Sequence, residues 1–251
     1  MRQLKFGIEL EVATSKSRQE VINALQNAGI KVEGARYGSD VIEGTWKVQP
    51  DGSINGWEIV SPPLNDVEDL KTVVHVLRKE LKVRCNKKTG LHIHHDVNDF
   101  NLHQLKNLYR LYNKYENNAI KSFVNPSRTQ TLYCSPVERI MHNVESASTI
   151  EEFKNSYSGR YYNLNNKAYV KYGTIEFRHH QGTTNINEIL AWVEFTHKLV
   201  ETAQHKEQVK RLYAGRTNEE AMDIMIEEFN IEDKKVVRQL KRAQKYVAKL
   251  A

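Results

Sequence analysis

The sequence predicts an α+β protein in which a sheet has one apolar face and one polar face. Three strand-like segments, 4–12, 89–96 and 173–178, alternate apolar and polar residues with a period of two. Other segments repeat apolar residues every three or four positions, which is the spacing of a helix. Because the apolar sides of the strands need a cover, we expect the helices to pack on one face of the sheet and to leave the polar face in water.

The composition describes an ordinary polar globular chain. Its 251 residues suffice for one large domain, or for one domain with an appendage. No stretch reaches 18 apolar residues, the first residues lack the apolar run of a secretory signal, and the two cysteines lack metal-binding spacing. We therefore expect a cytoplasmic protein that does not enter a membrane. A formal charge of +6 favours anionic ligands such as nucleotides, without identifying one.

The first half of the chain predicts two helices between its strands. Ser17 and Glu20 form a capping-box pattern, which predicts a helix that ends at Gly29. Segment 30–48 is β-like, segment 49–53 has turn residues, and 57–60 is a short strand. Asn65, followed three residues later by Glu68, predicts the cap of a helix that continues to about residue 81.

The second half predicts two long helices and a long polar loop. Apolar residues at helical spacing predict helices over 102–123 and 186–204, and we expect Pro126 to close the first of them. Segment 126–160 is irregular, with short helical pieces near 137–144 and 149–156, and its length and polarity favour a substrate loop. Segment 160–165 is strand-like.

The pattern changes after residue 205, so we divide the chain into a catalytic domain, 1–205, and a helical C-terminal extension, 206–251. Two charged helices are expected near 217–229 and 232–249, joined around Asn230. The last helix carries an apolar seam at coiled-coil spacing and a basic outer face. That helix either packs on the domain with a solvated basic face or contacts another copy of the chain, an acidic partner or nucleic acid.

The polar faces of the three strands share one pattern, a pair of ligand-capable side chains two positions apart. The pairs are Glu9 with Glu11, His92 with His94, and Glu176 with Arg178; Asp51 and Glu58 add two carboxylates from a turn and the strand after it. Two glutamates about 6–7 Å apart repel by roughly 2–3 kcal/mol, so we expect a cation between them. Carboxylates suit magnesium or manganese, and arginine suits phosphate oxygens.

In this order the motifs resemble those of the amidoligases, which belong to the carboxylate–amine ligase superfamily with glutamine synthetase and glutamate–cysteine ligase. The resemblance covers about residues 4–200 and rests on GIELE (7–11), DGS (51–53), EIVSPPL (58–64), GLHIH (90–94), RYYNLN (160–165) and TIEFR (174–178), followed by Gly182–Thr183. It implies a curved antiparallel sheet of the glutamine synthetase catalytic type, with the site on its concave face. The stretch 179–181 is more polar than the family's usual continuation.

The resemblance also implies roles for individual residues. The implied metal ligands are Glu9, Glu11, Asp51, Glu58, His92 and Glu176. The implied nucleotide-site residues are His94, Arg160, Asn165 and Arg178, of which Arg178 would hold the γ-phosphate and Arg160 and Asn165 would touch phosphate or the acyl substrate. Arg178, Arg160 and Glu58 are the residues that we expect to act in catalysis.

The implied reaction is ATP-dependent amide formation with two or more Mg²⁺ or Mn²⁺ ions. ATP converts a carboxylate, such as that of glutamate, to an acyl phosphate, and an amine of a small molecule, peptide or other acceptor displaces the phosphate.

Two other functions are compatible with the residues alone. A metal-dependent hydrolase could use His92, His94 and Asp96, although an arginine beside Glu176 suits phosphate better. A non-catalytic module could bind through the basic C-terminal helix. We expect six other histidines to be structural or at the surface, and we give them no part in the site: His95, His103, His142, His179, His180 and His197.

Overall fold

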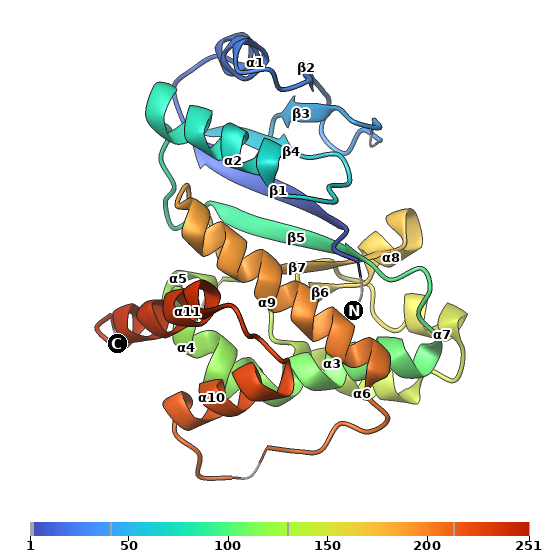
Figure 1. Cartoon of the computed structure of the whole chain (residues 1–251). Coiled ribbons are helices and arrows are strands. Elements are labelled where there is room, and N and C mark those ends of the chain that lie inside the picture. Colours follow the sequence, from blue (N-terminus) through green and yellow to red (C-terminus); the bar gives the residue numbers. More distant parts are fainter. Residues whose placement is uncertain (1–2, 41, 130, 213, 251) are drawn as a thin grey trace.

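A computed structural model describes residues 3–40, 42–129, 131–212 and 214–250, and it contains a seven-stranded sheet with helices around it (Figure 1). The strand order is β2-β3-β4-β1-β5-β7-β6. The bounds are β1 Phe6–Ala13, β2 Val32–Gly34, β3 Trp46–Gln49, β4 Gly56–Val60, β5 Gly90–Asp96, β6 Leu164–Asn165 and β7 Thr174–Gln181. Neighbouring strands are antiparallel except β2 and β3, which are parallel. The predicted α+β class and mainly antiparallel sheet are confirmed.

The helices account for most of the remaining chain. Their bounds are α1 Arg18–Asn27, α2 Glu68–His75, α3 Leu102–Tyr115, α4 Lys121–Phe123, α5 Pro126–Thr129, α6 Met141–Ser146, α7 Ile150–Lys154, α8 Lys167–Tyr172, α9 Ile186–His205, α10 Asn218–Glu228 and α11 Lys234–Val247. Two π-helical turns, Val76–Glu80 and Glu116–Ile120, continue α2 and α3, and Val137–Ile140 is a 3₁₀ turn.

Local sequence signals placed α1 correctly. The Ser17 side chain accepts from the backbone of Glu20, whose carboxylate accepts from the Ser17 backbone, so the predicted capping box forms. Gly29 then takes a φ of +86°, a left-handed conformation that glycine adopts without steric cost. The neighbouring β-like segment becomes β2 and β3 with a loop between them, and its residue 41 lies outside the described residues.

Three local expectations were wrong. The helix after β4 is capped by Val67 instead of Asn65, because the Asp66 carboxylate accepts from the Glu68 amide and turns the chain first. Only the last two residues of the strand expected over 160–165 pair in the sheet. Pro126 does not close α4, which ends at Phe123; it begins the separate helix α5.

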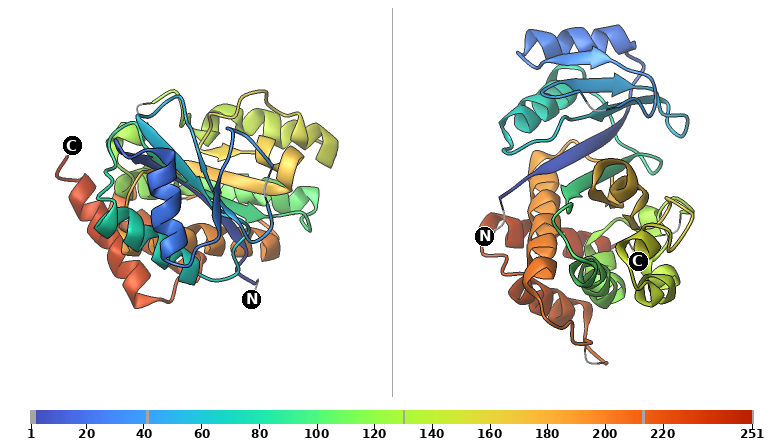
Figure 2. Two further views of the ribbon diagram at one scale, coloured as in Figure 1. Left: turned by 90° about the horizontal axis from the view of Figure 1, so that it is seen from above. Right: turned by 90° about the vertical axis from the view of Figure 1, so that its right-hand side faces the viewer.

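The apolar face of the sheet carries the core. Phe6, Ile8, Leu10 and Val12 of β1 are all buried there, whereas Glu9 points to the opposite face. Helices α1, α2 and α9 lie along this face, and α3 packs against α9 (Figures 1 and 2). The short helix α8, which the sequence did not predict, instead borders the polar face, where Ala168 and Tyr172 line a cleft. The polar face is therefore a cleft and not an open surface. The expectation that it stands in water was wrong for Glu11, Glu58, His92 and Glu176, which are buried because α8 and neighbouring loops border this face.

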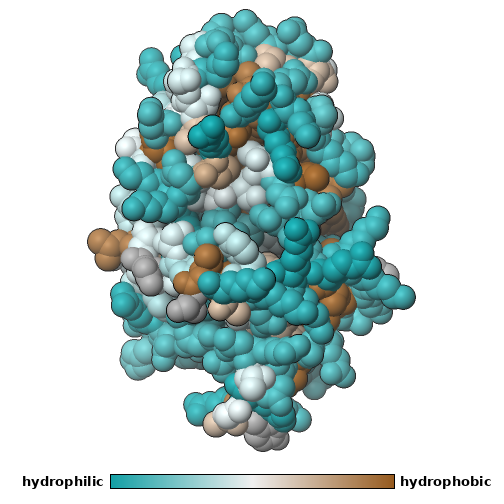
Figure 3. Space-filling model, turned by 90° about the vertical axis from the view of Figure 1, so that its left-hand side faces the viewer, coloured by the Kyte–Doolittle hydropathy of each residue, from teal (hydrophilic) through white to brown (hydrophobic). Residues whose placement is uncertain are grey.

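The C-terminal helices pack on the helical layer of the same chain. Helix α11 contacts α9 and α4, and Val236 and Leu240 of its apolar seam are buried, whereas Leu250 is 49% exposed. From the side on which the C terminus lies, hydrophobic residues form small separate patches between hydrophilic ones (Figure 3). The division of the chain at residue 205 stays a prediction.

None of the described helices is both long enough and apolar enough to cross a membrane.

Candidate active site

The pairing of strands places the predicted site residues side by side on the polar face. Glu9 of β1 lies opposite His92 of β5, and Glu11 lies opposite Glu58 of β4. On the far side of β5, His94 lies opposite Glu176 of β7. Because β1 is central in the sheet, its two glutamates meet ligand-capable residues from both neighbouring strands.

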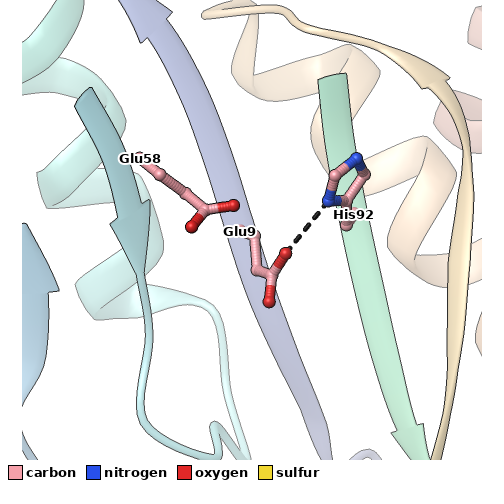
Figure 4. A group of neighbouring side chains, drawn as sticks. All are labelled: Glu9, Glu58 and His92. Atoms are coloured by element: carbon pink, nitrogen blue, oxygen red, sulfur yellow. Dashed lines mark hydrogen bonds and ion pairs between the residues drawn. The ribbon is translucent and has the colours of Figure 1, made fainter. Parts of the chain in front are cut away.

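Three overlapping groups could each hold a metal ion. The groups are Glu9, Glu58 and His92; Glu9, His94 and Glu176; and Glu11, Asp51 and Glu58, and within each group the ligand atoms all lie within 4.8 Å of one another. Figure 4 shows the first group, with side chains from β4, β1 and β5 turned toward one another. Glu9 and Glu58 each belong to two groups, so a single carboxylate could bridge neighbouring ions.

Glu9 accepts hydrogen bonds from both histidines. Its Oε2 lies 3.0 Å from His92 Nδ1, and its Oε1 lies 3.2 Å from His94 Nε2. Although burial opposes the charged form, the hydrogen bonds from His92 and His94 hold the pKa of Glu9 well below its ordinary value. Burial likewise opposes the charged form of His94, but the contact with Glu9 raises the pKa of His94. Glu9 is therefore held as a carboxylate.

Glu58 and Glu11 form a like-charge pair directly across two strands, an arrangement that destabilises a sheet without a counter-charge. Burial, together with the charges of Glu9, Glu11 and Asp51, raises the pKa of Glu58 well above its ordinary value. The Gln49 amide donates to the Glu58 carboxylate at 2.5 Å, and the Gly90 amide donates to Glu11 Oε2 at 2.6 Å. These bonds fix the direction of both side chains but supply no positive charge.

A β-bulge brings an arginine into this group. The register shifts between Leu91 and Ile93, so that two residues of β7, Arg178 and His179, lie opposite the single residue His92. Arg178 forms an ion pair with Glu176 Oε1, while the Asn165 amide donates to Glu176 Oε2 at 2.6 Å. Despite the burial of Glu176, the charge of Arg178 lowers the pKa of that carboxyl group.

All ten residues singled out from the sequence line one cleft of about 880 Å³: Glu9, Glu11, Asp51, Glu58, His92, His94, Arg160, Asn165, Glu176 and Arg178. They occupy different parts of it. Asp51 is fixed by its own turn, because its Oδ1 accepts from the Ser53 amide at 2.6 Å. Arg160 stands at an aromatic border of the cleft, 5.7 Å from the ring of Tyr37 and 5.2 Å from that of Tyr161.

A comparison of the sequence with known protein families agrees with this geometry. A family model described as "Putative amidoligase enzyme" matches residues 2–200, which include every residue of the site. The chain belongs to this amidoligase family. A search of curated proteins found no match. The family predicted from the motifs is confirmed, and membership supports an enzyme that forms amide bonds.

Two buried basic residues of this amidoligase cleft were not found from the sequence. Lys47 of β3 is buried, and its Nζ donates to the carbonyl oxygens of Ser39 and Asp40 at 2.8 and 3.2 Å. Burial lowers the pKa of Lys47. Arg128 of α5 is also buried. Neither residue stands in a recognisable motif, although the alternation of Lys47 with buried Trp46 and Val48 is a weak signal for a polar-face residue.

The residues present fit divalent ions. His92 Nε2 is buried without a hydrogen-bond partner and lies 3.6 Å from Glu11 Oε1, as expected of a ring nitrogen that is free to ligate a metal. The neighbouring donors are carboxylate oxygens, which Mg²⁺ and Mn²⁺ prefer. A positive ion would also remove the repulsion between Glu11 and Glu58.

Proposed function

We propose that the protein is an ATP-dependent carboxylate–amine ligase of the superfamily that includes glutamine synthetase and glutamate–cysteine ligase. Its reaction would pass through an acyl phosphate, with glutamate as a candidate acid and an amine of a small molecule, peptide or other acceptor as nucleophile. The observation that carries this proposal is the set of three overlapping ligand groups beside Arg178 on one face of the sheet. Membership of the amidoligase family supports amide formation as the outcome.

The chain's own residues have separable tasks in this proposal. The three ligand groups would hold two or more Mg²⁺ or Mn²⁺ ions, which supply charge neutralisation for the phosphates when bound. The Arg178 guanidinium would hold the transferred phosphoryl group through paired N–H donors. Asn165 and Glu176 orient each other through their hydrogen bond, and Glu176 in turn holds Arg178. Arg160 and His94 would border the nucleotide or acyl substrate.

The arrangement favours a phosphate-handling site over a hydrolytic centre built on His92, His94 and Asp96. Among the described residues, His92 and His94 fall in different ligand groups, and none of the groups contains Asp96. Asp96 instead forms an ion pair with Lys5 at 2.9 Å. A metal held by both histidines and this aspartate therefore has no assembled site here.

The location of the enzyme and the role of its C-terminal helices are further parts of the proposal. We propose that it works in the cytoplasm and that the C-terminal helices take part in assembly or acceptor recognition. Binding of nucleic acid or an acidic partner by the basic face of α11 is the competing role for that region.

The decisive experiment is ADP release, screened over amino acids and amine acceptors in the presence of Mg²⁺, followed by the mass of the product. We expect release that needs both substrates and is abolished by EDTA and by Glu9→Ala. Glu33→Ala, a change at an exposed glutamate of β2, is the matched control and should leave turnover unchanged. Turnover that persists in Glu9→Ala would refute the metal assignment, and a product without a new amide would refute the ligase.

A further inference from the structure

Arg128 is a buried arginine in the wall of the cleft. It belongs to the short helix α5, which follows the long helical segment ending at Phe123. The residue is 4% exposed and yet lines the cleft that holds the ligand groups. Arginine is rarely buried to this extent unless a partner compensates its charge.

The protein supplies only part of that compensation. One Arg128 nitrogen, Nη2, donates to the carbonyl oxygen of Arg178 at 3.0 Å, whereas Nε is buried without a hydrogen-bond partner. Within the described part of the chain, no carboxylate forms an ion pair with Arg128. A buried guanidinium with an unused donor and no counter-ion carries a large desolvation cost, which an anionic ligand would offset.

Arg128 lies next to the metal-ligand groups. A Cβ atom placed on Gly90 would be 2.8 Å from His92 Nε2 and 2.9 Å from Arg128 Nη2, so these two nitrogens lie within about 6 Å of each other. Only a glycine leaves both nitrogens this room. An anion bound to a metal at His92 would therefore be within reach of Arg128.

Arg178, like Arg128, has a guanidinium nitrogen that lacks a hydrogen-bond partner. Its Nε is also buried without a partner, although its guanidinium forms an ion pair with Glu176. We infer that Arg128 and Arg178 together form a paired-guanidinium site for the phosphoryl group that the proposed reaction transfers, which makes Arg128 a further catalytic arginine beside those expected from the sequence. This inference rests on the proposed function. A phosphoryl group has three peripheral oxygens and can engage two guanidiniums at once, whereas one fork already satisfies the two oxygens of a carboxylate.

A purely positioning role for Arg128 would have a different signature. Cys134 Sγ also donates to the Arg178 carbonyl oxygen, at 3.2 Å, so Cys134→Ala removes a bond to the same atom without removing a charge. If Arg128 served only to hold that carbonyl, the arginine and cysteine variants would change nucleotide binding in the same way.

The test compares the affinities of the Mg²⁺ complexes of AMP-PNP and ADP for the full chain, measured by calorimetry. Arg128→Gln should weaken AMP-PNP binding by about 10- to 100-fold, the range for one or two charge-assisted hydrogen bonds, and change ADP binding by less than about twofold. Arg128→Lys, a gentler change, should show the same selective loss because an ammonium lacks the planar fork. Cys134→Ala should leave the ratio of the two affinities as in the original protein.

The outcomes separate the two levels of the proposal. Equal losses for both nucleotides, an unchanged AMP-PNP affinity in both arginine variants, or the same selective loss in Cys134→Ala would overturn the role of Arg128 alone. If the original protein binds neither nucleotide, the proposal of an ATP-dependent function is refuted. The melting temperature and Mn²⁺ affinity of each variant report whether the fold and ligand groups persist.

Discussion

Replacing Gly90 by alanine tests the geometry of the site with the smallest available change. The variant adds one methyl group and keeps the backbone amide that donates to Glu11 at 2.6 Å. The new Cβ atom would lie 2.8 Å from His92 Nε2, where ordinary contact begins near 3.4 Å, so the nitrogen must retreat by about 0.6 Å. Metal sites tolerate ligand displacements of only about 0.2 Å.

We therefore expect Gly90→Ala to weaken Mn²⁺ binding by about 10- to 100-fold, the range seen when the support of a metal ligand is lost. Overpacking should lower the free energy of unfolding by only about 1–3 kcal/mol, because His92 and Arg128 can rotate while the strand keeps its ladder. Mn²⁺ titration followed by electron paramagnetic resonance measures the first quantity, and chemical denaturation measures the second.

Gly159→Ala is the matched control, because its Cβ atom would meet only Tyr162, at an ordinary 3.4 Å. It should bind Mn²⁺ like the original protein. Unchanged Mn²⁺ affinity in Gly90→Ala would show that His92 Nε2 does not face the bound ion, and the metal assignment of His92 would have to be abandoned.

Three further predictions concern the phosphate site and the C-terminal helices. Arg178→Lys should lose most ADP-releasing activity, because a point charge cannot replace the planar guanidinium; full activity would move the clamp elsewhere. Phe229→Ala should lower the free energy of unfolding by about 3–5 kcal/mol in urea denaturation, because Phe229 is 1% exposed, whereas Leu250→Ala should cost less than about 0.5 kcal/mol; equal effects would refute this packing. Burial of Glu228 opposes its charged form, but hydrogen bonds from Lys114 and Lys206 hold its pKa below the ordinary 4.5. The stability that Glu228 contributes should be fully present above pH 4.5 and lost as the pH falls through the lowered pKa of Glu228. The melting temperatures of Glu228→Gln and the original protein should therefore differ above pH 4.5 and converge in acid.

The local elements were largely determined by short-range sequence signals. Alternation over 4–12 predicted β1, and the Ser17 capping box predicted α1, because each signal depends on residues within one or two turns of each other. The same locality explains the failures. Helix α8 has six residues and is capped by Gly173, which has a φ of +69°, so it is too short to establish a helical period.

Much of the candidate site could also be predicted from the sequence, because its residue pairs are local features of single strands. Residues two positions apart on a strand share a face, so the pairs in β1, β5 and β7 were visible without a structure. The family resemblance then supplied the expectation that they act together, and the strand order brought them onto one face.

Only the tertiary structure decided which charges are compensated. The bulge that sets Arg178 and His179 opposite His92 depends on the pairing of two strands that are almost 80 residues apart in the sequence, and no local pattern encodes it. Arg128 lies in a polar loop segment of the sequence, and its burial beside Gly90 arises from the packing of α5 against β7. Burial and counter-charge are properties of the surroundings of a side chain. The sequence therefore indicated the pairs of ligand-capable residues, while the fold determined which positive charges lack a carboxylate partner.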